Sequence, residues 1–195
     1  MVIQEKVTEK TVRQFVATVS DQHHAMAGAV IAASAAQAAA LGEACMQISL
    51  DEQVDKLDWS DVTARIAQMA HIKTTLLEWC DRDATAIAEY VALLDAGDEL
   101  EGQQLLCDAP AEVSRLSIEA ATLLQDFRPL VIEKVQDDLE MSIGLLAGTA
   151  HAAMLLLDSN LRIWPTSELL AGYEPARAKL EAQIDQLLPV SRIRQ

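Results

Sequence analysis

The chain has 195 residues, of which 51% are hydrophobic and 4% aromatic, and its 30 acidic and 15 basic residues give a formal net charge of -15. This length suits a single domain over residues 1–195 with one sizeable core. The charge argues against nucleic acid and an anionic membrane surface as partners, because both would be repelled. No apolar segment of a secretory signal occurs in the first ten residues, so we expect a cytoplasmic protein.

The composition predicts an all-α protein. Ala and Leu recur throughout, while runs of β-branched and aromatic residues are missing. We therefore expect an antiparallel bundle of about six helices. Cys45, Cys80 and Cys107 are odd in number, widely spaced and set among apolar residues, so they imply neither a disulfide framework nor a zinc site.

The first predicted helix is short and amphipathic. Thr8 is a candidate N-cap, and Val12, Phe15, Val16 and Val19 follow at the spacing of one helical face. This pattern predicts a buried stripe.

The second predicted helix carries no charge between residues 25 and 42. A membrane span has this length, but alanine dominates the segment, and Ser34 and Gln37 interrupt it. Alanine buries little area and lets helices approach closely. We interpret the segment as a central helix of the bundle rather than a membrane span.

A long third helix of about 35 residues is predicted from a Ser60 cap to the break at residues 97–102. Asp81 and Asp83 fall inside it and could hold a cation or a polar ligand. Because Arg82 lies between them, a solvated surface is the favoured interpretation of this pair.

The next helix is predicted to begin at an Asp108 cap with Pro110 in its first turn, and to end near Pro129. The fifth begins at about Asp137 and runs to Asn160.

Between residues 139 and 157 of that fifth helix, only Glu140 and His151 can carry charge, so it is the second central helix rich in small residues. Trp164-Pro165 ends it, and a last helix is predicted from about Pro175.

Sites of chemistry are sparse in this sequence. His23-His24 with Asp21 could bind a metal, but no second ligand cluster accompanies them. No histidine has a glutamate three residues before it, as the Glu-x-x-His motif of a di-iron bundle requires. We therefore predict no metal. Nucleophile motifs, phosphate loops and dinucleotide fingerprints are also absent.

Asp137-Asp138 is the most suggestive pair, because it opens an otherwise apolar helix. A partly desolvated carboxylate there could serve as a general acid or base, and the alternative is simple N-capping by one of the two. His151, in the middle of an apolar segment, is typical of a core or interface histidine.

Taken in order, these segments resemble the cyclodeaminase/cyclohydrolase family of helical folate enzymes. The resemblance is carried by three stretches of this sequence: Ala27-Gly28-Ala29-Val30-Ile31 followed by an alanine helix ending at Met46, Asp83-Ala84 through Tyr90 with Ala109-Pro110-Ala111 after it, and Asp137-Asp138-Leu139-Glu140 followed by His151 and Asn160.

The resemblance implies a dimer of antiparallel helices and chemistry at the N5-N10 bridge of tetrahydrofolate, with a tetrahydrofolate derivative as substrate and no metal or redox cofactor. It places Asp138 as the catalytic proton shuttle, Asp137 beside it, and Gly28 near the pterin. It also places His151 and Asn160 among the ligand-binding residues.

The sequence departs from the family pattern at two places. Ala29 and Val30 stand where the family has glycines, so we expect ordinary helix rather than a glycine loop there. An acidic strip over residues 51–56 replaces the family's lysine-rich run. The alternative to a folate enzyme is therefore a non-catalytic helical homodimer with another ligand or a protein partner.

Overall fold

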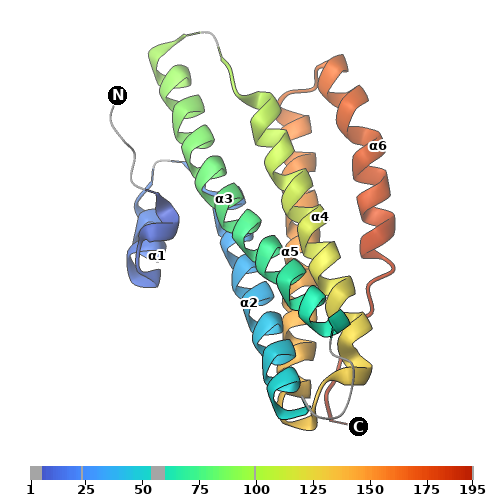
Figure 1. Cartoon of the computed structure of the whole chain (residues 1–195). Helices are drawn as coiled ribbons and strands as arrows, with labels where there is room; N and C mark the ends of the chain where they lie inside the picture. The colour runs from blue at the N-terminus through green and yellow to red at the C-terminus, as the bar shows by residue number, and fades with distance from the viewer. Residues whose placement is uncertain (1–5, 23, 54–59, 99, 195) are drawn as a thin grey trace.

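The computed structural model describes residues 6–22, 24–53, 60–98 and 100–194. In these ranges it contains six α-helices, two 3-10 helices and no strand (Figure 1). They are η1 (Val7–Glu9), α1 (Val12–Asp21), α2 (Ala27–Gln53), α3 (Ser60–Ala96), α4 (Gln103–Phe127), η2 (Arg128–Leu130), α5 (Glu133–Ile163) and α6 (Ser167–Ile184). The predicted fold class is confirmed.

Helices α2 to α5 form an antiparallel four-helix bundle, and α6 packs against α4 and α5 (Figure 1). The register of α2 against α5 is fixed by two side chains. Ser142 Oγ donates to the Ala38 carbonyl at 2.7 Å, and the Ile132 amide donates to Ser49 Oγ at 3.3 Å. Residues of α2 and α5 that lie level with each other therefore have numbers that sum to about 180.

The alanine-rich segment is the centre of the bundle, as predicted. Seven alanines of α2 are buried: Ala29, Ala32, Ala33, Ala35, Ala36, Ala38 and Ala39. At Gly42 a Cβ would stand 2.5 Å from Leu124 Cδ1, so α4 approaches α2 closely only because this position lacks a side chain. Small residues therefore set the spacing of the helices.

By length and composition alone, α2 and α5 are each apolar enough to cross a membrane. Core helices of soluble proteins pass the same test. Half of the most apolar window of α2 is buried inside the bundle, and 39% of that of α5. The most apolar window of α5 is thus less buried than that of α2.

The expected buried stripe on the first helix is wrong. Helix α1 begins after a Thr11 cap, with Thr11 and Gln14 forming a reciprocal capping box, and it contains no buried residue. Val12 and Val16 are 71% and 58% exposed. Its amphipathic pattern is present, but only Phe15 and Val19 of that face pack against the core, and both are half-buried.

The start of the fourth helix also differs from the prediction. Helix α4 begins at Gln103, so Pro110 lies inside it rather than in its first turn. A proline inside a helix leaves the carbonyl four residues earlier without its usual partner. Here that carbonyl belongs to Leu106, and it accepts a hydrogen bond from Asn160 Nδ2 on α5 at 2.7 Å. The side chain of α5 replaces the missing backbone bond.

Two further helices begin earlier than predicted. Helix α5 begins at Glu133 after Ile132, so Asp137 lies in its second turn and is not an N-cap. Helix α6 begins at Ser167 with Thr166 as its cap, and Pro175 lies inside it. Pro175 is exposed, so water can bond the carbonyl that this proline leaves free.

Candidate functional site

A buried carboxyl lies where α2 begins beside α3. Asp83 of α3 is only 5% exposed, and Gly28 in the first turn of α2 faces it. A Cβ at Gly28 would stand 2.2 Å from Asp83 Oδ1, so glycine is required for this approach. The expectation that Asp83 lies on a solvated surface is wrong.

The environment of Asp83 changes its protonation. Burial raises the pKa of its carboxyl from 3.8 to about 6, and a hydrogen bond from the Ala29 backbone opposes this rise. The amides at the start of a helix favour an anion, but here they do not outweigh desolvation. A carboxyl with this pKa can both give and accept a proton near neutral pH.

A buried thiol lies next to this carboxyl. Cys80 is one turn before Asp83, and its Sγ donates to the Ala29 carbonyl at 3.3 Å. Burial, followed by the charges of Asp81 and Asp83, raises the pKa of the Cys80 thiol to about 12. Cys80 therefore stays protonated and holds the first turn of α2 against α3.

Beside this site, η1 and α1 cover neighbouring parts of α2 and α3, and neither contains a fully buried residue. The cover is attached through Thr8, whose amide and Oγ1 donate to the Asp81 carboxylate at 3.0 and 2.7 Å. Asp81 is therefore a structural anchor rather than a free surface charge.

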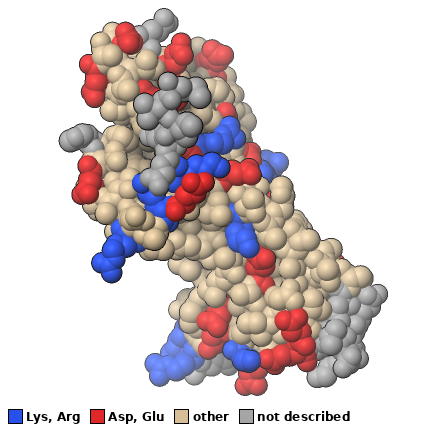
Figure 2. Space-filling view, turned by 60° about the vertical axis from the view of Figure 1, so that its left-hand side comes forward, with Lys and Arg blue, Asp and Glu red and all other residues tan. Residues whose placement is uncertain are grey.

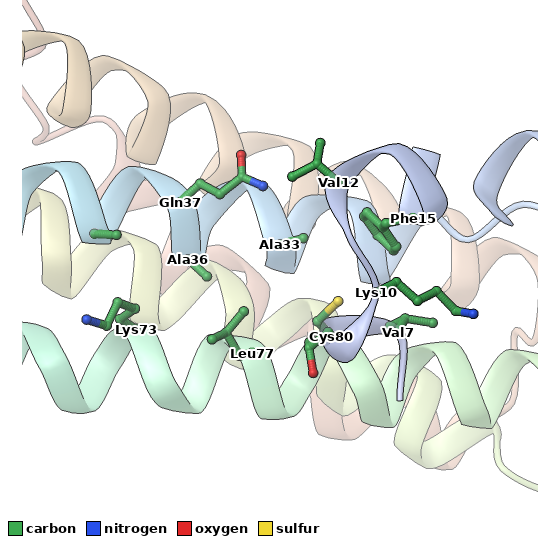
Figure 3. A pocket seen from close by; sticks show the side chains of 12 residues that line it. Val7, Lys10, Val12, Phe15, Ala33, Ala36, Gln37, Lys73, Leu77 and Cys80 are labelled. Carbon is green, nitrogen blue, oxygen red and sulfur yellow. The ribbon is translucent and has the colours of Figure 1, made fainter. Parts of the chain in front are cut away.

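Two cavities lie beneath this cover. The first, of about 260 Å³, lies between α1, α2 and α3 and is mainly apolar, with Phe15, Ala36, Leu77 and Cys80 around it and Lys10 and Lys73 on opposite sides (Figure 3). The second, of about 270 Å³, is more polar, and its lining includes Asp81 and Thr85. Val7 and Lys10 line both cavities, so the two are neighbours, and neither is lined by Asp83 or Gly28.

The structure separates two residues that the sequence placed in one site. Gly28 lies at one end of α2, level with about residue 152 of α5, whereas Asp138 lies level with about Gly42. At 1.5 Å per residue, these levels are about 20 Å apart along the bundle. Within one chain, Gly28 and Asp138 do not share a site.

The remaining predicted site residues are also dispersed. Asp138 is half-buried, and its charge adds to the effect of burial in raising the pKa of Cys45 to about 11. Asp137 and His151 are exposed, and Asn160 bonds the Leu106 carbonyl. Of the predicted residues, only Gly28 lies at the buried carboxylate.

Among the residues that the structure describes, no three His, Cys, Asp or Glu side chains gather in a way that could hold a metal ion. His24 is half-buried beside the second cavity, and His23 lies outside the described residues. In Figure 2, acidic groups lie at the top of the face shown, and acidic and basic groups are mixed across its middle and at its lower end.

Sequence reasoning missed Asp83 as a functional residue, although a signal was present. Leu76, Cys80, Asp83 and Ile87 follow one another at steps of four, three and four residues, which puts the carboxylate on the apolar stripe of α3. Arg82 instead stacks on Trp79 at 3.9 Å from the ring centroid and does not pair with Asp83.

Comparison with known proteins agrees with the resemblance found in the sequence. The crystal structure of formiminotetrahydrofolate cyclodeaminase from Thermotoga maritima has the same fold, with a TM-score of 0.69, 20% identity and 93% of each chain covered. A search of curated proteins gives no match. The profile of the formiminotransferase-cyclodeaminase family matches residues 11–174. Because this match spans most of the chain, the protein belongs to the formiminotransferase-cyclodeaminase family.

Proposed function

We propose that this protein is a folate-dependent one-carbon enzyme that acts at the N5-N10 bridge of a tetrahydrofolate derivative, as a methenyltetrahydrofolate cyclohydrolase or a formiminotetrahydrofolate cyclodeaminase. Family membership supports the substrate class. The observation that carries the proposal is the buried Asp83 carboxyl against Gly28, with its pKa raised to about 6.

Asp83 is the proposed proton-transfer residue. Opening a cyclic amidinium requires a water to lose a proton as it attacks and a ring nitrogen to gain one as the C–N bond breaks. Cyclodeamination similarly moves protons while ammonia leaves. The proposed reaction needs no metal or redox cofactor, because only water, ammonia and protons are exchanged.

Substrate would reach Asp83 by displacing η1 and α1. The cover has no fully buried residue and is attached by the Thr8–Asp81 hydrogen bonds and by the half-buried Val7, Phe15 and Val19, so its opening disturbs only packing at the edge of the core. The apolar cavity under α1 supplies a surface for a flat ring, and the more polar cavity beside it supplies hydrogen-bonding groups.

Two variants test which carboxylate acts. Purified wild-type protein should remove the methenyl chromophore of methenyltetrahydrofolate or release ammonia from formiminotetrahydrofolate. Asp83→Asn should lower kcat by at least about a hundredfold, the usual range for loss of a general acid or base. Asp138→Asn, at the position that the family resemblance indicates, should retain most of the activity.

The opposite pattern, with Asp138→Asn inactive and Asp83→Asn active, would restore Asp138 to the catalytic role. Absence of turnover by the wild type with both substrates would refute the enzymatic proposal.

A second candidate is a non-catalytic helical protein of the same family. It is favoured by the backbone at Ala29 and Val30, which continues α2 as ordinary helix with no positive φ outside Gly97 and Gly102 among the described residues. Exposed Asp51 and Glu52 also repel an anionic ligand tail. Binding of a reduced folate without turnover would support this candidate.

A further inference from the structure

The apolar cavity between α1, α2 and α3 differs in charge from the rest of the molecule. The chain has a net charge of -15, yet none of the described residues that line this cavity is acidic, and two of them, Lys10 and Lys73, are basic. The groove beside α4 and α6, by contrast, is lined by Glu112, Glu119 and Asp126. An anion is repelled over most of this protein, but not at this cavity.

The walls of the apolar cavity suit the body of an elongated apolar molecule. Ala33, Ala36 and Ala40 line it from α2, so the side chains on that wall are short. Leu77 points toward Ala36 from α3, and it is 38% exposed, so the cavity opens to solvent (Figure 3). The cavity measures about 260 Å³, whereas an apolar cavity of about 150 Å³ already binds benzene. The space is therefore large enough for a ring with a short chain attached.

Lys73 gives this cavity a positive end. Lys73, Leu77 and Cys80 follow one another on α3 at steps of four and three residues, so they share one face of the helix. Lys73 and Cys80 consequently stand about 10 Å apart along α3, on opposite sides of Leu77 (Figure 3). Asp83, the proposed proton-transfer residue, lies three residues beyond Cys80. A molecule that lies along this face has a cation at one end and the buried carboxyl beyond the other.

The ammonium group of Lys73 has an exchangeable partner, Glu43 of α2. Lys73 Nζ lies 2.5 Å from Glu43 Oε2, and the two side chains are 32% and 22% exposed. A partly exposed ion pair contributes little net stability, so a ligand carboxylate can replace Glu43 at small cost. The exposed Gln37 amide, which also lines the cavity, can donate a hydrogen bond to the ligand. Lys10 is a poorer anchor, because it belongs to the cover that moves when a ligand enters.

We propose that the apolar cavity binds an elongated molecule with an apolar body and a terminal carboxylate, and that Lys73 recognises this carboxylate by exchanging Glu43 for it. The ligand lies lengthwise between α2 and α3, with its uncharged end toward Cys80. The inference rests on the proposed function only where it identifies this ligand with the substrate, whose uncharged end then points toward Asp83.

The first test compares two probes of the same shape, the anionic 2-naphthylacetate and the neutral 2-naphthylacetamide, by calorimetric titration of the full chain. The wild type should bind the carboxylate at least about tenfold more tightly than the amide, because a charge-assisted hydrogen bond is the stronger one. Lys73→Met keeps an apolar stem, so it should weaken binding of the carboxylate about tenfold and leave binding of the amide unchanged. Glu43→Gln should strengthen binding of the carboxylate about threefold, because it removes the competing anion.

Two further variants locate the probes. Lys134→Met is the matched control, because Lys134 pairs with Glu52 at 2.8 Å on an exposed surface and does not line the cavity. It should leave both affinities unchanged. Ala40→Leu places a larger side chain at a half-buried position of the cavity wall and should weaken binding of both probes. Unchanged circular dichroism shows that each variant folds.

Equal affinity of the wild type for the two probes, binding of neither, or carboxylate binding that is unchanged in Lys73→Met would overturn the proposal. These titrations involve no turnover, so their outcome is separate from that of the enzymatic proposal. Selective binding of the carboxylate without turnover of a reduced folate supports the ligand class and refutes the reaction. Turnover together with equal probe affinities supports the reaction and refutes the role of Lys73.

Discussion

Replacing Asp83 by asparagine should make the stability of this protein less sensitive to a rise in pH from about 4 to 7. In the wild type, burial raises the pKa of Asp83 from 3.8 to about 6, so the folded state holds its proton more tightly than the unfolded chain. The stabilising contribution of the protonated carboxyl is therefore complete below pH 3.8 and is lost as the pH rises through 6. Above that range the folded protein carries a buried charge.

The shift of about two pH units corresponds to roughly 3 kcal/mol, of which roughly 2–3 kcal/mol falls between pH 4 and pH 7. Urea unfolding of wild type and Asp83→Asn across this range gives the difference in their free energies of unfolding. As the pH rises from 4 to 7, the free energy of unfolding of Asp83→Asn should increase by roughly 2–3 kcal/mol relative to that of the wild type. Asp83→Ala should show the same slope with a different offset, because it also lacks the titrating group. A difference that does not change with pH would show that Asp83 is not a buried carboxyl with a raised pKa.

Three other perturbations test separate contacts. Asn160→Ala should lower the free energy of unfolding by about 1–3 kcal/mol, because the buried Leu106 carbonyl loses its hydrogen-bond partner. In a Pro110→Ala background the loss should be smaller, since the backbone amide of residue 110 can then donate to this carbonyl. Equal losses in urea titrations of the two backgrounds would contradict this role of Asn160. Gly28→Ala should destabilise by about 1–3 kcal/mol through overpacking, and Asp83→Ala should relieve it; a purely additive double variant would argue against their contact. Thr8→Val should accelerate proteolysis within residues 6–22 while changing the free energy of global unfolding by less than about 1 kcal/mol. An unchanged rate of cleavage would show that the hydrogen bonds to Asp81 do not hold the cover.

The sequence predicted the fold class well because the helical periodicity is long and strong. The alanine-rich segment becomes the central helix, and the long third helix begins at Ser60 as expected. Helix starts were less predictable. Pro110 looked like a first-turn proline, and only the distant Asn160 side chain allows it to stand inside α4.

The site was harder to predict for a physical reason. Charge patterns in sequence do not show burial, so Asp83 beside Arg82 looked like solvated surface, although Gly28 from another helix buries it. The antiparallel register likewise separates Gly28 from Asp138, although both lie near helix starts. Burial of a charge depends on residues distant in sequence, which periodicity alone does not reveal.

The central claim is that a reduced folate binds at Gly28 and Asp83. Calorimetric titration with 5-formyltetrahydrofolate, a stable reduced folate, tests it most directly. We expect micromolar binding to the wild type, to Asp138→Asn and to Asp83→Asn, because the last change removes proton transfer rather than the cavity. Gly28→Val, which fills the approach to Asp83, should abolish binding while Ser34→Val on the outer face of α2 should not. No heat with the wild type at millimolar ligand, or binding that survives Gly28→Val in a folded variant, would contradict the claim.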